Sequence, residues 1–152
     1  MSGARTPSIA DLRWTPDLAC VDWNELSTLY RIAPLGEKSA ADLEIAFSNS
    51  RHACFVHDGA TLVGAGRALA DGVDCAYLCD VAVHPAYQGI GLGKAIIGHL
   101  RDRCAGHRKI ILYANPGKEG FYAKLGFRRM KTAMAIFRDQ ERAIRGGLVD
   151  GD

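Results

Sequence analysis

The chain has 152 residues and a net charge of +2; 48% of its residues are apolar and 24% are charged. These values are typical of one globular domain, so we expect a single domain over 1–152 with a C-terminal tail at 139–152. Such a small net charge does not favour nucleic acid or a charged membrane surface as a partner. No apolar run approaches the roughly 20 residues of a membrane helix, and the first 14 residues contain no long hydrophobic stretch. We therefore expect a soluble cytoplasmic protein with neither nucleic acid nor a membrane as partner.

The five cysteines are odd in number and scattered through apolar segments. This pattern favours buried, reduced thiols over a disulfide framework. Cys75 and Cys79 lie four residues apart, but no second Cys or His pair stands at metal-binding spacing, so no metal site is predicted.

The N-terminal third predicts one strand and two helices. Residues 8–14 alternate in the manner of a strand. Asp22 followed by Glu25 three residues later is typical of a helix start. Ser39 is the expected N-cap of a second helix, in which apolar side chains recur every four residues.

Three apolar runs follow, at 52–58, 61–70 and 75–83. Asp58 and Gly59 between the first two runs are a strong signal for a hairpin. A further turn separates the second run from the third, so the three runs predict an antiparallel meander.

A glycine-containing stretch at 86–95 then opens a helix, and KIILYA at 109–114 reads as a buried strand. Strand, helix and strand in this order predict a parallel crossover. The residues expected on the buried helix face are Leu92, Ile96, Leu100 and Cys104.

The C-terminal part predicts a helix, a last strand and a tail. Asn115 is the expected N-cap, Pro116 the first helical residue and Gly126 the left-handed terminator. Residues 127–137 alternate like a strand, and a short helix is expected after Arg138. The predicted order β-α-α-β-β-β-α-β-α-β defines an α/β class of fold, α+β in detail, with a mixed sheet covered by helices on both faces.

Gly89, Gly91 and Gly93 alternate just before the helix, although glycine costs chain entropy on folding. A phosphate-bearing ligand would explain them, because backbone N–H groups converge at a helix start and the helix dipole favours an anion there. A P-loop does not fit, since Gln88 stands at the first glycine position and Ala95 at the hydroxyl position. A dinucleotide fingerprint does not fit either, because its third glycine is replaced by a lysine.

The stretch VAVHPAYQGIGLGKA instead resembles the acetyl-CoA motif of the GCN5-related N-acetyltransferases (GNAT family), [RQ]-x-x-G-x-[GA] at a strand-to-helix turn. NPGKEGFYAKLGF resembles the family's fourth helix and following strand, and the resemblance covers roughly residues 60–137. It implies a GNAT acyl-CoA N-acyltransferase fold and acetyl-CoA as cosubstrate, without a metal. The residues that it implies for acetyl-CoA binding are Val81, Ala82, Val83, Gln88, Gly89, Ile90, Gly91, Leu92, Gly93, Lys94, Asn115 and Tyr122. Lys94 either adds charge to the pyrophosphate site or is a solvated surface lysine.

The resemblance also implies a bulge in the strand at 75–83, which parts it from the next strand so that the pantetheine arm fits between them. The amide of Val81 is then expected to stabilise the oxyanion of a tetrahedral intermediate. Tyr122 is expected to protonate the leaving thiolate; the alternative is that it only packs against the cosubstrate. Phe121 and Leu125 are expected to face the core, with Tyr122 turned away from them.

Asp80 is the candidate for accepting the amine proton or binding a cationic acceptor, and a salt-bridged or capping role is the alternative. The acidic bias of the first two helices favours a small cationic amine as acceptor. These features predict acetyl transfer to a primary amine by direct attack in a ternary complex. A CoA-binding sensor or non-catalytic partner domain is the alternative. Relatives are often dimers, so a homodimer formed through residues 130–137 or the tail is a further expectation.

Overall fold

The computed structural model describes Arg5 and residues 7–152. The chain forms two compact units, the first ending at Leu112 and the second comprising Tyr113–Asp152. The first unit contains a five-stranded sheet in the order β1-β2-β3-β4-β5. Its strands are β1 (Arg13–Thr15), β2 (His52–Asp58), β3 (Thr61–Ala70), β4 (Cys75–Val83) and β5 (Lys109–Ile111).

The predicted meander and crossover are confirmed, but the last strand of the crossover ends at Ile111 and not at Ala114, and none of its residues is fully buried. β1 to β4 pair antiparallel, and β5 pairs parallel to β4. In the β2–β3 hairpin Asp58 pairs with Thr61, so Gly59 is the first residue of the turn and has a φ of +58°. This is the backbone conformation for which glycine is favoured in tight hairpins.

Two helices begin where the sequence predicts. α1 (Trp23–Ile32) is capped by Asp22, whose carboxylate accepts from the amides of Asn24 and Glu25. α2 (Ala40–Ser48) is capped by Ser39. The Glu25 carboxylate accepts from the amide of Leu62 at 3.2 Å, so it ties α1 to the hairpin.

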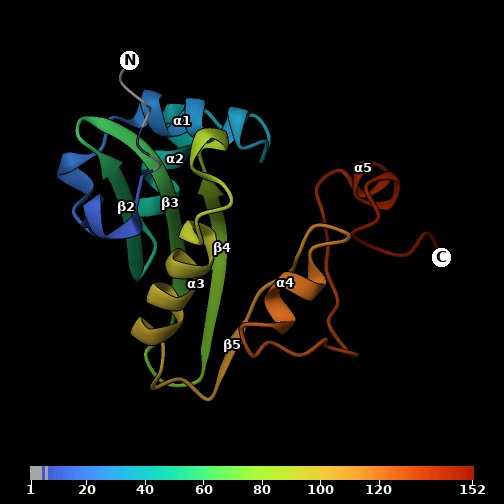
Figure 1. Ribbon diagram of the computed structural model, residues 1–152. Coiled ribbons are helices and arrows are strands. Elements are labelled where there is room, and N and C mark those ends of the chain that lie inside the picture. The colour runs from blue at the N-terminus through green and yellow to red at the C-terminus, as the bar shows by residue number, and fades with distance from the viewer. Residues whose placement is uncertain (1–4, 6) are drawn as a thin grey trace. The chain divides into compact units, whose positions relative to one another are not determined.

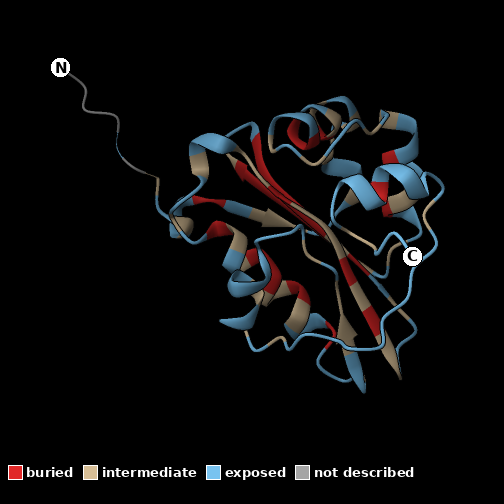
Figure 2. Cartoon of the chain, turned by 90° about the vertical axis from the view of Figure 1, so that its right-hand side faces the viewer, coloured by how far each residue is buried: buried red, intermediate tan, exposed pale blue. Residues whose placement is uncertain are grey.

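Helices cover both faces of the sheet, as predicted. α1 and α2 lie behind the sheet in the view of Figure 1, and α3 (Leu92–Arg103) lies in front of it. The α1–α2 face holds a core cluster that includes Phe47, Phe55 and Ala65. Figure 2 shows that the buried residues follow the central strands. On the other face, a Cβ added to Gly66 would lie 3.0 Å from Ile96 and Leu100, so glycine there lets α3 approach β3 closely.

The first strand is shorter than predicted. Ile9–Asp11 form a 3-10 turn capped by Ser8, and only Arg13–Thr15 pair with β2. The alternation of residues 8–14 therefore reflects one capped turn followed by a short edge strand.

The second unit contains α4 (Glu119–Ala123) and α5 (Gln140–Arg145). The prediction that Asn115 caps the first of these helices is wrong, since the N-cap position is Lys118. Gly117 has a φ of +88°, which a right-handed helix does not accommodate, so residues 115–118 form a turn instead. Gly126 terminates the segment with a φ of +94°, as predicted.

The predicted last strand at 127–137 is absent from the part of the chain that the structure describes. Met134 and Ile136, two of its alternating apolar residues, are 94% and 96% exposed. Alternation makes a segment suitable for a sheet, but a strand forms only where a ladder partner exists. The helix expected after Arg138 is confirmed as α5.

Candidate functional site

β4 contains the bulge that the sequence resemblance implies. Ala65 pairs with Ala82 and Arg67 pairs with Cys79, so Gly66 alone faces both Asp80 and Val81. A bulge of this kind leaves its extra residue outside the ladder and bends the strand.

Asp80 is the residue that makes the bulge. Its φ is +55°, and it is the only non-glycine residue with positive φ in the described chain. Aspartate tolerates this left-handed region better than most side chains, because its short polar group can form local hydrogen bonds. The side chain points to the α1–α2 face, where its carboxylate accepts from Arg67 Nε at 2.7 Å and lies 3.4 Å from Lys38 Nζ.

The bulge also has a contact from α1. Tyr30, which is completely buried, donates its hydroxyl hydrogen bond to the backbone carbonyl of Asp80 at 2.6 Å. Burial raises the pKa of Tyr30 well above its usual value of 10, so the hydroxyl remains a donor at neutral pH. Burial likewise raises the pKa of the neighbouring Cys79 to about 11, which keeps its thiol protonated and unsuited to nucleophilic attack.

The pairing of β4 with β5 is confined to one end. Register partners run from Cys75–Lys109 to Tyr77–Ile111, and residues 78–83 have no β5 partner within the described ranges. The bulge therefore lies in the part of β4 where this edge carries no ladder.

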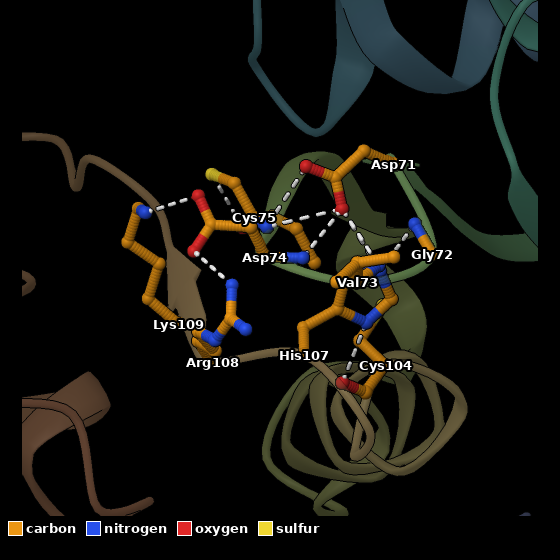
Figure 3. Close-up of polar contacts among 10 residues, drawn as sticks. Asp71, Gly72, Val73, Asp74, Cys75, Cys104, His107, Arg108 and Lys109 are labelled. Atoms are coloured by element: carbon orange, nitrogen blue, oxygen red, sulfur yellow. Dashed lines mark hydrogen bonds and ion pairs between the residues drawn. The ribbon is translucent and has the colours of Figure 1, made fainter.

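A cluster of polar contacts closes the paired end (Figure 3). Lys109 Nζ lies 2.7 Å from the carboxylate of Asp74. His107 accepts from the amide of Gly72 through Nε2 at 2.9 Å, and its Nδ1 contacts the Cys104 carbonyl at the end of α3. These contacts hold the start of β5 against the β3–β4 turn.

The entry to α3 follows β4. Gly89 and Gly91 have φ values of +82° and +85°, while Gly93 lies in the first turn of the helix. A Cβ on Gly89 would meet no atom within 4 Å, so backbone conformation and not packing requires glycine there. Gly91 is the N-cap and makes no side-chain capping hydrogen bond, in contrast to the caps of α1 and α2. The first amides of α3 are therefore open to an external anion.

The remaining predicted binding residues of the first unit surround this entry. Gln88 and Lys94 are exposed, Ile90 is half-buried, and Leu92, the first residue of α3, is buried. Ala82 is buried, whereas Val81 and Val83 are half-buried. The bulge of β4 and the open start of α3 are thus separated along the chain by one short segment, which contains the 3-10 turn Pro85–Tyr87.

Tyr122 and Asn115 belong to the second unit, and the structure describes them within that unit. Tyr122 lies in α4, edge-on to the rings of Phe121 and Phe127, and burial raises the pKa of its hydroxyl. Asn115 is exposed. The expectation that Phe121 faces the core is wrong, since it is 40% exposed, and Leu125 is half-buried.

Sequence reasoning missed the contacts that Tyr30 and Arg67 make with the bulge. Arg67 offered a signal, because it is the one charged residue in the run 61–70. A charge inside a strand of that kind needs a partner when it is buried. Tyr30 offered no such signal, because its place in the apolar pattern of α1 already accounts for a buried ring.

Comparison with known proteins agrees with the resemblance to N-acetyltransferases that the glycine motif carries. Residues 19–127 match the Acetyltransferase (GNAT) family, and the chain belongs to this family. A GNAT-family acetyltransferase of Streptococcus pneumoniae TIGR4 has the same fold, with a TM-score of 0.68 and 23% identity over 84% of this chain and 97% of that one.

Two plant proteins are similar in sequence. The chain is 32% identical over 108 residues to GCN5-related N-acetyltransferase 1, chloroplastic, of Arabidopsis thaliana, covering 68% of this chain and 55% of that protein. It is 42% identical over 84 residues to Serotonin N-acetyltransferase 2, chloroplastic, of Oryza sativa subsp. japonica, covering 52% and 42%. The chain spans about two fifths to just over half of the length of the curated relatives that it matches first. None of the described helices is both long and apolar enough to cross a membrane.

Proposed function

We propose that this chain is an N-acetyltransferase, which moves the acetyl group of acetyl-CoA to the primary amine of a small molecule. The observation that carries the proposal is a bulged β4 followed, after the 3-10 turn Pro85–Tyr87, by an α3 start without a side-chain cap. Family membership supports the same activity, and both plant relatives are named as N-acetyltransferases.

The open α3 entry suits the pyrophosphate of acetyl-CoA. Amides between Gly89 and Lys94 supply donors, the helix dipole favours negative charge, and the glycines leave room above the backbone. The cosubstrate brings an activated thioester. Val81, Ala82 and Val83 lie beyond the part of β4 that pairs with β5, so their main-chain groups on that edge can pair with an extended pantetheine arm. In this proposal Gln88, Asn115 and Tyr122 complete the binding residues.

The reaction is direct attack in a ternary complex. The neutral amine adds to the thioester carbonyl, and the Val81 amide stabilises the resulting oxyanion. The intermediate collapses as the C–S bond breaks, and Tyr122 donates its proton to the departing thiolate. The amine loses one proton, which in this proposal passes to Asp80, and exchange with solvent then clears this proton and restores the one that Tyr122 gave up. Both carboxylate oxygens of Asp80 already face cations, Arg67 and Lys38.

The acceptor that we propose is a small cationic amine, in line with the relative named for serotonin. Two of the acidic residues that gave the first two helices their acidic bias already have hydrogen-bond partners in the structure. Asp22 caps α1, and Glu25 accepts from the amide of Leu62. Lys38 and Arg67 lie beside the bulge and outnumber Asp80 in charge. This observation favours, as a second candidate, an amine that also carries an anionic group.

The test is an acceptor screen with acetyl-CoA and a thiol reagent. The panel contains arylalkylamines, polyamines, aminoglycosides and amino sugar phosphates. Release of CoA thiol with one amine class supports the enzyme and identifies its acceptor. Calorimetric binding of CoA without turnover across the panel would support a sensor or partner domain, and no CoA binding would reject the proposal.

Two further proposals concern the setting of the protein. A homodimer is proposed through residues 130–137, whose apolar side chains Met134 and Ile136 are exposed; sedimentation at several concentrations tests it.

A cytoplasmic location is proposed from the sequence alone, and the plant relatives carry chloroplastic names. Fractionation of the source cells tests the location.

A further inference from the structure

We propose that Tyr30 and Arg67 are positioning residues that orient the Val81 amide by holding Asp80 in its left-handed conformation. This inference rests on the proposed function, in which that amide stabilises the oxyanion. It assigns a role to two side chains from elements distant in sequence, α1 and β3, that meet at the bulge of β4.

The central contact is the hydrogen bond from the Tyr30 hydroxyl to the Asp80 carbonyl, at 2.6 Å. The carbonyl of Asp80 and the N–H of Val81 belong to the same peptide unit, which is planar. In a trans peptide the two groups point in opposite directions, so holding the oxygen toward Tyr30 aims the N–H away from α1. The hydrogen bond also polarises the peptide, which makes the N–H a stronger donor.

Tyr30 is well suited to hold this peptide. Its side chain is 0% exposed and belongs to the core cluster with Leu26 and Phe47. A buried ring on a helix has few alternative rotamers, so its hydroxyl occupies a defined point. Its raised pKa keeps the proton on the hydroxyl.

Arg67 holds the same residue by a second group. Its Nε donates to the Asp80 carboxylate at 2.7 Å, and its Nη1 donates to Ser50 Oγ at 3.3 Å. The guanidinium also lies 6.0 Å from the centre of the Phe47 ring. Because the guanidinium is anchored at both ends, it restrains the aspartate side chain on the α1–α2 face.

Both restraints are needed because the conformation is unfavourable for an ordinary side chain. A φ of +55° is rare outside glycine, with asparagine and aspartate the main exceptions. The hydrogen bond from Tyr30 holds the carbonyl that follows the Asp80 Cα, and the one from Arg67 holds the side chain, so together they restrict rotation about that Cα.

The first test is Tyr30→Phe, which removes one hydroxyl and keeps the buried ring. We expect kcat to fall about tenfold or more because the Val81 amide loses its orientation; complete removal of one oxyanion donor costs about 100- to 1,000-fold. The Kd for CoA should change less than about twofold. Tyr87→Phe is the matched control, because its hydroxyl bonds Asp58 and not the bulge; its kcat should match the parent protein. Arg67→Lys should retain more activity than Arg67→Met.

The second test separates positioning from proton transfer at Asp80. Glycine and asparagine both adopt positive φ more readily than alanine. If the conformation matters, Asp80→Gly and Asp80→Asn keep more kcat than Asp80→Ala. If the carboxylate is the essential base, all three variants lose kcat alike.

A third measurement does not depend on turnover. The Val81 amide resonance in 15N-labelled protein should shift in Tyr30→Phe and stay in place in Tyr87→Phe. An inactive parent protein would reject the proposed function but leave this readout valid. Unchanged kcat together with an unmoved Val81 resonance in Tyr30→Phe would overturn the positioning role.

Discussion

Substitution of Gly91 by alanine tests whether the open start of α3 is shaped for an anion. Gly91 has a φ of +85°, and a Cβ there would meet only Ile9, at 3.7 Å. The substitution therefore adds no steric clash but forces an L side chain into the left-handed region, which costs about 1–2 kcal/mol. If the loop keeps its shape, the free energy of unfolding falls by this amount.

If the loop instead relaxes to a negative φ, its amides turn away from the anion, and binding carries the cost. A loss of about 1–2 kcal/mol corresponds to roughly a 5- to 30-fold rise in the Kd for CoA. Calorimetry with CoA measures the loss of binding free energy, and a thermal melt measures the loss of folding stability. A loss of about 1 kcal/mol in stability lowers the Tm by about 2–4 °C in a chain of this size.

Gly98→Ala is the matched control in the same helix. A Cβ on Gly98 would approach only the Arg101 side chain, at 3.9 Å, and alanine inside a helix is favoured by about 0.5–1 kcal/mol. We expect a higher Tm and unchanged CoA binding. If Gly91→Ala leaves both Tm and Kd unchanged, or if Gly98→Ala weakens CoA binding equally, the reasoning about the α3 start is wrong.

Three further outcomes are expected. Gly66→Ala should lower stability by about 1–3 kcal/mol in chemical denaturation, because the new Cβ would lie 3.0–3.2 Å from Ile96, Leu100 and Val81; a stability equal to that of the parent would contradict the close packing of α3. Burial lowers the pKa of His57 from 6.5, so below about pH 6.5 the unfolded chain binds more protons than the folded chain, and the Tm should fall as the pH drops. The Tm of His57→Gln should fall less over the same pH range. An equal fall in the variant would exclude His57 as the cause. Tyr122→Phe should lower kcat about 100-fold with the Kd for CoA unchanged, and since burial raises the pKa of Tyr122, the parent kcat should not decline below about pH 10 through loss of this proton. Equal turnover in Tyr122→Phe would exclude Tyr122 as the acid.

Local signals predicted the first unit well. The caps Asp22 and Ser39, the Gly59 turn and the four-residue spacing from Leu92 to Leu100 each act within a few residues along the chain. Short-range hydrogen bonds and periodic burial decide such features, so reading the sequence in windows finds them.

The errors fall where a longer-range condition decides the outcome. Asn115 and Pro116 are good helix-starting residues, but the positive φ of Gly117 two residues later moves the start to Lys118. Residues 127–137 alternate as a strand does, and the structure provides no ladder for them within its described part. Neither a turn conformation nor the presence of a partner strand can be read from alternation.

At the candidate site, too, the sequence predicted the features that depend on neighbouring residues and missed those that depend on distant ones. The glycine motif lies within one stretch of sequence, and the resemblance that it supports located the bulge and the α3 entry. What holds the bulge comes from 50 residues away in Tyr30 and 13 residues away in Arg67. A window that contains Asp80 therefore leaves open whether its carboxylate accepts a proton or belongs to a salt bridge. In the folded chain that carboxylate forms ion pairs with Lys38 and Arg67, and we propose that the second of these also restrains the backbone beside the Val81 amide. For this reason the comparison of glycine, asparagine and alanine at position 80 decides between chemistry and geometry, because only geometry distinguishes among those three side chains.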